Sequence, residues 1–306
     1  MKIAIMGTGG QGGLFGSLLA KAGNDVSLIA RGKNLEALQE KGIKLKSRVF
    51  GDVEVTGTVT DDPKEIGLVD LVLMCVKTYD LDEATELIKP MIGPDTMVLT
   101  VQNGVEAPYR VGELIGSEHV VAGVSVINAH LTSPGFVTHH GGKQLIIGEL
   151  DNEITPRVKR LENVFKDIGF DIRVSGNIKW NLWRKLTTLS GFHGVCCLIR
   201  SPIGTVFEFS ETRDLMYRVI LETSKVALAD GIEFPDKMVE DTVVGAGRMP
   251  KDTEPSMLVD LLAGRRIELD TFNGAVVRFG KKYGVNTPYN YAIYAALLPY
   301  LNGPPK

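Results

Sequence analysis

The sequence predicts an α/β fold in which a doubly wound, parallel sheet is followed by an all-helical C-terminal domain. Apolar runs of strand length alternate with helix-like segments through the first half of the chain. From Asn177 onward only helical periodicity is found. The pattern changes near residue 175, so we expect two domains, residues 1–175 and residues 176–306.

The chain opens on a strand and a glycine-rich turn. Lys2–Met6 is a short apolar run, and the six residues after it fit G-x-G-x-x-G and lead into helical spacing. In a Rossmann-type domain these glycines allow a tight turn, a close approach of the pyrophosphate and close packing of the helix. The expected dinucleotide-binding residues are Gly7, Thr8, Gly9, Gly10, Gln11 and Gly12. An ordinary glycine-rich turn is the alternative.

The second strand, residues 25–30, ends at a basic residue rather than an acidic one. An NAD-binding domain usually has Asp or Glu at this point, where the carboxylate binds the ribose 2′-hydroxyl. Here Arg31 takes that place, and a guanidinium can bind a 2′-phosphate through charge-assisted hydrogen bonds. We therefore expect NADP; a solvated arginine at the start of a helix is the alternative.

Further strands are expected at residues 53–59, 69–76, 97–101, 119–126 and 170–174. Helices are expected at residues 35–41 and 156–168 and in a stretch that ends at Ile88, and residues 133–150 predict a β-hairpin that turns at Gly141 and Gly142. Lys77 and Asn103 follow two of the strands at their carboxyl ends, where ligands of such sheets bind. We expect both residues to contact the cofactor, with plain strand-end polar residues as the alternative.

The second half predicts helices at residues 180–198, 212–229, 237–244, 255–262, 268–283 and 288–301. A cleft between a cofactor domain and a helical domain is the usual place for a substrate. Lys185 could polarise a carbonyl and donate a proton, and Glu268, expected to begin a helix, could bind a substrate hydroxyl or orient the lysine. A solvated helix lysine and a solvated helix-start glutamate are the alternatives.

Composition excludes several classes of protein. The 306 residues are 44% hydrophobic and 23% charged, with a net charge of −3 and no basic stripe, which argues against a nucleic-acid partner. No apolar run is long enough to span a membrane, and the nucleotide strand follows Met1 at once, so we expect a cytoplasmic protein. Three cysteines do not indicate a disulfide framework, and the adjacent Cys196 and Cys197 are interpreted as packing residues. No metal site is expected, because His139 and His140 would point to opposite faces of a strand.

Six segments in this order resemble the ketopantoate reductase (2-dehydropantoate 2-reductase) family over nearly the whole chain. They are GTGGQG at the N-terminus, Arg31, CVKT around Lys77, VQNG around Asn103, LWRKL around Lys185, and SML…IELDTFNG from Ser256 to Gly274. The resemblance implies a 6-phosphogluconate dehydrogenase-like fold and NADPH-dependent reduction of ketopantoate to pantoate in pantothenate biosynthesis. It also implies that Lys185 is the general acid, that Glu268 holds the substrate hydroxyl or the lysine, that Ser256 binds the substrate carboxylate and that Asn103 helps to fix the cofactor and the lysine.

The chain departs from the family pattern in the expected substrate site. The family usually has Asn at the two positions one and two helical turns beyond its lysine, whereas this chain has Leu189 and His193. Leucine cannot make the hydrogen bonds of asparagine, and a site that leaves a substrate hydroxyl unpaired discriminates against that substrate. His193 could donate one bond or could be a packed core histidine.

Three functions therefore stay open. The first is a reductase of 2-dehydropantoate, and the second is a family member that acts on a bulkier or more apolar 2-oxo acid. The third, of another class, is a non-catalytic NADP-binding regulator. The expected partner is a small 2-oxo acid. The helical domain could present a homodimer face, but the sequence does not fix the oligomeric state.

Overall fold

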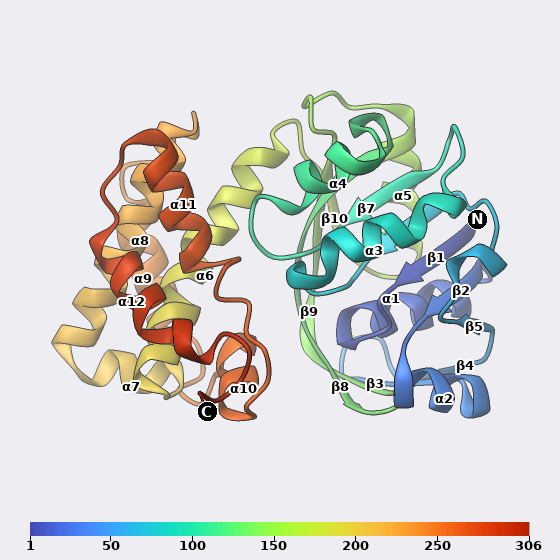
Figure 1. The fold of residues 1–306 in the computed structure, drawn as a ribbon, viewed down its shortest axis with the longest axis horizontal. Coiled ribbons are helices and arrows are strands. Elements are labelled where there is room, and N and C mark those ends of the chain that lie inside the picture. Colours follow the sequence, from blue (N-terminus) through green and yellow to red (C-terminus); the bar gives the residue numbers. More distant parts are fainter. Residues whose placement is uncertain (306) are drawn as a thin grey trace. The chain divides into compact units, whose positions relative to one another are not determined.

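A computed structural model of the chain describes residues 1–305 (Figure 1). The chain forms two compact units. Unit 1 comprises Met1–Gln102 and Glu106–Ile178, and unit 2 comprises Asn103–Val105 and the residues from Lys179 onward. The short segment Asn103–Val105 thus belongs with the helical part of the chain.

Unit 1 is built on a ten-stranded mixed sheet with the strand order β4-β3-β9-β8-β7-β6-β1-β2-β5, and β10 pairs with β9. The strands are β1 (Lys2–Met6), β2 (Asp25–Ile29), β3 (Ile43–Ser47), β4 (Val53–Val55), β5 (Thr58–Thr60), β6 (Leu71–Met74), β7 (Met97–Thr100), β8 (Val120–Ser133), β9 (Phe136–Gly148) and β10 (Asp171–Val174). The pairs from β5 through β2, β1, β6 and β7 to β8 are parallel, whereas β8 with β9 and β3 with β4 are antiparallel.

Both faces of this sheet are covered, as the doubly wound pattern predicts. The helices are α1 (Gly10–Lys21), α2 (Gly32–Lys41), α3 (Leu81–Ile88), α4 (Ala107–Ile115) and α5 (Pro156–Asp167). Strand β1 divides its side chains between two cores, since Ile3 and Ile5 pack with residues of α1 and α5, and Ala4 and Met6 pack with residues of α3 and α4. A strand buried on both faces reads as a continuous apolar run, which explains why β1 was predicted correctly.

The predicted hairpin is present, but its turn was placed wrongly. Strands β8 and β9, the two long strands of Figure 1, are joined at Pro134 and Gly135. Gly142 lies within β9 at φ +81°, and a Cβ there would be 2.4 Å from the carbonyl oxygen of Val126. The register shifts beside it, after Val126, so the glycine pair forms an irregularity inside a strand and not a turn.

Other differences from the predicted elements are local. Strand β3 was missed, and the strand expected at residues 53–59 is two short strands, β4 and β5. Strand β8 runs well beyond its expected end at residue 126. Strands β3, β4 and β5 are too short to show a clear periodicity in the sequence. Where each strand pairs and ends depends on neighbouring strands that are distant in sequence.

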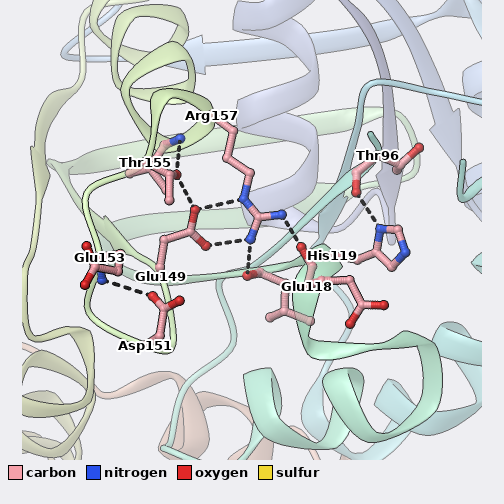
Figure 2. Close-up of polar contacts among 10 residues, drawn as sticks. Thr96, Glu118, His119, Glu149, Asp151, Glu153, Thr155 and Arg157 are labelled. Carbon is pink, nitrogen blue, oxygen red and sulfur yellow. Dashed lines mark hydrogen bonds and ion pairs between the residues drawn. The ribbon is translucent and has the colours of Figure 1, made fainter. Parts of the chain in front are cut away.

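Arg157 joins α5 to two strands of the sheet (Figure 2). Its guanidinium donates to both carboxylate oxygens of Glu149, at 2.8 and 2.6 Å, and also to the backbone oxygens of Glu118 and Val120. The side chain of Glu149 is almost fully buried, and its hydrogen bond is the largest cause that raises the pKa of Arg157. The bidentate pair fixes the start of α5 to the end of β9, and the two backbone bonds fix it to the start of β8.

Unit 2 is helical. Its helices are α6 (Ile178–Ile199), α7 (Ile203–Glu208), α8 (Ser210–Ala229), α9 (Met238–Gly247), α10 (Ser256–Leu262), α11 (Asn273–Tyr283) and α12 (Pro288–Leu297). The short α7 was not predicted. Helix α11 begins at Asn273, so the prediction that Glu268 begins a helix was wrong. Glu268 instead begins a separate turn, in which its carbonyl oxygen accepts the backbone NH groups of Thr271 and Phe272.

Asp230 ties the first turns of α6 to the end of α11. Its carboxylate accepts hydrogen bonds from Trp183 Nε1 at 2.8 Å, from Lys179 Nζ at 3.0 Å and from the hydroxyl of Tyr283. Burial alone would raise the pKa of Asp230, but these three donors outweigh it and lower the pKa below 3.8. Across residues 1–305, no helix combines the length and the apolar character that a membrane crossing needs.

Candidate active site

The glycine turn of unit 1 is tight because its first and last glycines have no room for a side chain. Gly7 has φ +95°, and a Cβ there would lie 2.7 Å from Val76 Cγ1. A Cβ on Gly12 would lie 2.2 Å from the Gly7 carbonyl oxygen, so α1 starts in direct contact with the turn. No atom lies within 4 Å of a Cβ placed on Gly9. The middle of the turn is therefore open, and a ligand can approach the backbone there.

The other three residues of the turn are held by protein contacts. Both the backbone NH and the hydroxyl of Thr8 donate to the Ile29 oxygen at 3.0 Å, which joins the turn to the end of β2. Gln11 Nε2 donates to Ser125 Oγ at 2.5 Å. A Cβ on Gly10 would lie 2.3 Å from the Ala129 oxygen of β8, so the backbone of the hairpin passes directly against the start of α1.

Arg31 lies directly after β2 at the N-terminus of α2, where the sequence placed it. Its guanidinium donates to Glu83 of α3 at 3.0 Å, and the side chains of this pair are 56% and 65% exposed. Exposed ion pairs contribute about 0–1 kcal/mol. The guanidinium can therefore exchange this carboxylate for a phosphate at little cost.

Asn34 was not predicted as part of the site. Its Nδ2 donates to the Thr8 oxygen at 2.8 Å, and its Oδ1 accepts the NH of Gly135, also at 2.8 Å. One amide side chain thus links the glycine turn to the turn between β8 and β9. Nothing in the local sequence signals this role, because Gly135 is distant along the chain.

Lys77 and Asn103 belong to different units. Lys77 follows β6 and precedes the 3₁₀ turn Thr78–Asp80 in unit 1. Asn103 is partly buried and belongs to unit 2, where a Cβ on the next residue, Gly104, would lie 2.9 Å from Thr271 Cγ2. The structure therefore groups Asn103 with the turn that carries Glu268.

Gln102, the last residue of unit 1 before this segment, is a second residue that the sequence reasoning missed. It is buried, and its Nε2 donates to the oxygens of Met74 and Val76, at 2.8 and 3.2 Å. These carbonyls lie at the end of β6, directly before Lys77. Gln102 therefore fixes the backbone from which Lys77 projects.

Lys185 lies in α6 and is partly buried. Burial lowers the pKa of its amine to about 8, and the negative charge of Glu268 acts in the opposite direction. Glu268 itself is only 5% exposed. A lysine with a pKa near neutrality can both hold and release a proton under ordinary conditions, which is what a general acid needs.

The same face of α6 carries Leu189 and His193, one and two helical turns beyond Lys185. His193 is buried, and its ring centroid lies 4.2 Å from that of Phe272, with the planes tilted by 38°. Phe272 was not predicted as part of the site, since in the sequence it is one apolar residue among several. Ser256 is the partly exposed first residue of α10.

Two side-chain pairs considered in the sequence have structural roles. His139 is buried and bonds Ser47 Oγ and the Gly142 oxygen, at 2.9 and 2.8 Å, whereas His140 is exposed. Cys196 and Cys197 are buried and free, and burial raises the pKa of the Cys196 thiol to about 12 and that of Cys197 further. Both thiols are therefore protonated packing groups.

Comparison with known proteins places these features in a family. Residues 3–152 match the family model of ketopantoate reductase PanE/ApbA, and residues 177–300 match the model of its C-terminal domain. The chain belongs to the ketopantoate reductase family. The family predicted from the sequence is thereby confirmed, as is its fold, and the chain is placed among oxidoreductases.

Relatives in the ketopantoate reductase family match the whole chain. The 2-dehydropantoate 2-reductase of Mesorhizobium japonicum is 30% identical over an alignment of 318 positions, which covers 96% of each protein. The crystal structure of 2-dehydropantoate 2-reductase from Geobacter metallireducens is 30% identical, with a TM-score of 0.92 over 97% of this chain and 99% of that one. The ternary structure of D-mandelate dehydrogenase with NADH and anilino(oxo)acetate is 27% identical, with a TM-score of 0.90 over 98% of both chains.

Proposed function

We propose that this protein uses NADPH to reduce a 2-oxo acid to the 2-hydroxy acid, with 2-dehydropantoate as the leading substrate. The observation that carries the proposal is the partly buried Lys185, whose pKa is lowered to about 8, together with the buried carboxylate of Glu268. Family membership supports the reaction class, since several relatives bear the name 2-dehydropantoate 2-reductase. On this proposal the enzyme serves pantothenate biosynthesis.

The residues of unit 1 fit a nicotinamide dinucleotide. The open backbone at Gly9 and the N-terminus of α1 suit a pyrophosphate, because free NH groups and the positive end of the helix dipole lie there. The similar D-mandelate dehydrogenase was solved with NADH, which supports this class of cofactor. The bound dihydronicotinamide supplies the hydride. Lys77 and Asn103 are proposed to contact the cofactor from the strand ends.

Arg31 favours NADPH over NADH in this proposal. It stands where an NAD-binding domain has a carboxylate, and its guanidinium is held by an exposed ion pair with Glu83. A bidentate bond to the 2′-phosphate would replace that pair. Each hydrogen bond to a charged group contributes about 1.5–3 kcal/mol, which corresponds to roughly a ten- to hundredfold preference.

Lys185 acts as the general acid. As negative charge develops on the carbonyl oxygen, the ammonium stabilises it and transfers a proton to it. Glu268 keeps the amine protonated at neutral pH, because its charge opposes the effect of burial on the Lys185 pKa. Ser256 is proposed to bind the substrate carboxylate, as the resemblance implies.

A second candidate is a more apolar or aromatic 2-oxo acid. Leu189 offers no hydrogen bond to a substrate hydroxyl, and His193 lies against Phe272, so this part of α6 presents apolar and aromatic groups. The similarity to D-mandelate dehydrogenase, solved with an anilino-substituted oxo acid, favours this candidate on independent grounds.

Oxidation of NADPH with a panel of 2-oxo acids tests the proposal. We expect turnover of 2-dehydropantoate or of an aryl or branched 2-oxo acid, and the ratio of their kcat/KM values decides between the two candidates. Lys185→Ala should lower kcat at least about a hundredfold, the size expected for a key electrostatic donor. NADPH binding without oxidation across the panel would instead support a non-catalytic regulator.

A further inference from the structure

A buried chain of hydrogen bonds joins helix α6 to the first residue of α11. Asn273 is fully buried, and its Nδ2 donates to the Ser190 oxygen of α6 at 3.2 Å and to Asn290 Oδ1 of α12 at 2.9 Å. Both amide hydrogens are therefore used, which fixes the orientation of the side chain. Three helices meet at this one amide.

The acceptor on α12 is itself held in place by Glu222. This carboxylate is 6% exposed and accepts three bonds of 2.9 Å, from the backbone NH groups of Tyr289 and Asn290 and from Asn290 Nδ2. A buried carboxylate at the N-terminus of a helix, with its oxygens satisfied by NH donors, is a stable anchor. Asn273 is thus bonded to a rigid partner.

Helix α6 makes room for this contact at Gly194. A Cβ on that residue would lie 2.7 Å from Asn273 Oδ1 and 2.8 Å from its Nδ2, so any larger residue would push α11 away. Within residues 1–305, the Oδ1 atom has no hydrogen-bond donor. The amide is therefore placed by its two donated bonds and by close packing against the bare backbone of α6.

The turn that leads into Asn273 carries the groups of the proposed site. The backbone NH groups of Thr271 and Phe272 both donate to the carbonyl oxygen of Glu268, which closes a turn directly before Asn273. Phe272 contacts His193, and the acceptor Ser190 lies between Lys185 and His193 on α6. The position of Asn273 thus sets the position of this turn against the face of α6 that bears the lysine.

We propose that Asn273 is a positioning residue, which holds the turn bearing Glu268 and Phe272 against α6 and so sets the geometry between Glu268 and Lys185. The inference rests on the proposed function for its kinetic consequence, but not for its structural one. Misplacing a reacting group by 1 Å can lower the rate about a hundredfold. Asn273 can therefore affect kcat without touching the substrate.

The test uses Asn273→Ala and the milder Asn273→Ser, which keeps a hydroxyl donor. The matched control is Ser190→Ala, which removes the 2.9 Å bond between Ser190 Oγ and Thr223 Oγ1 but keeps the carbonyl that Asn273 uses. For each folded variant we would measure kcat, the KM for NADPH, and hydrogen exchange of residues 268–273. The pH dependence of Lys185 modification, read by mass spectrometry without substrate, reports the pKa of its amine.

We expect the Asn273 variants to lower kcat between about 10- and 100-fold, with the KM for NADPH within about twofold of wild type. Exchange of residues 268–273 should accelerate, and the Lys185 pKa should fall because Glu268 no longer supports it. Ser190→Ala should change none of these. The inference is overturned when the Asn273 variants match Ser190→Ala in exchange and in Lys185 titration. Hydrogen exchange and Lys185 titration need no turnover, so they test the role of Asn273 even when no 2-oxo acid is reduced.

Discussion

The imidazole of His193 lies against the ring of Phe272, with the two centroids 4.2 Å apart. This contact gives the α6 face beyond Lys185 an aromatic character where the family usually has asparagine. An imidazole packed against an aromatic ring is restricted in orientation by its neighbour, so His193 adds aromatic surface to this face of α6. We expect the two departures from the family pattern, Leu189 and His193, to set substrate preference.

The double variant Leu189→Asn, His193→Asn tests that expectation. It restores amides at the two positions and should raise the kcat/KM ratio of 2-dehydropantoate over an aryl 2-oxo acid by at least about tenfold, because hydrogen-bonding groups discriminate strongly for a substrate hydroxyl. Steady-state kinetics with both substrates measures it. An unchanged ratio in a folded variant would show that these residues do not line the substrate site.

The pH profile of reduction should depend on Glu268. Lys185 must be protonated to act as the acid, so activity should be present at low pH and should fall as the pH rises through about 8. Glu268 supports the protonated form, so Glu268→Gln should lower the Lys185 pKa and move this fall to lower pH. Glu268→Asp keeps the charge and serves as the control. A profile that is the same in all three proteins would refute the electrostatic coupling.

Arg31→Ala should raise the KM for NADPH by roughly ten- to a hundredfold and leave that for NADH nearly unchanged, because only NADPH carries the 2′-phosphate. Glu83→Gln is the matched control. It removes the exposed ion pair but leaves the guanidinium in place, so it should not weaken NADPH binding. Equal losses for both cofactors would mean that Arg31 does not recognise the phosphate.

Asp230→Asn should destabilise unit 2, since one carboxylate accepts bonds from Trp183, Lys179 and Tyr283. We expect a loss of about 2–4 kcal/mol in the free energy of unfolding, measured by denaturant titration at neutral pH. The lowered pKa of Asp230 means that its contribution is present above pH 3.8 and is lost as the pH falls below that value. The difference between wild type and variant should therefore shrink in acid, and a constant difference would contradict this assignment.

The features that the sequence predicted well have local causes. The glycine turn follows from backbone sterics at Gly7 and Gly12, and the helix that carries Lys185 follows from the helical periodicity of residues 180–198. The doubly wound sheet follows from apolar runs buried on both faces. Each of these features can be predicted from residues that lie close together in the sequence.

The features that were missed depend on contacts that are distant in sequence. Gly141 and Gly142 carry the usual signal of a turn, yet the chain turns at Pro134 and Gly135 because the pairing of β8 with β9 fixes the register. Glu268 was placed in a helix because apolar residues flank it, although helix α11 starts only at Asn273. Asn34 and Gln102 bond backbone groups far along the chain, which no local pattern can indicate.

The contact between Gly10 and Ala129 limits how this fold can be redesigned. With no space for even a methyl group between them, the nucleotide turn and the long hairpin are built to fit one another. A turn transplanted from another dehydrogenase, with any larger residue at this position, would displace the hairpin unless its own hairpin were transplanted too. Efforts to switch cofactors in this scaffold should therefore begin at the far end of β2 and leave the first helix untouched.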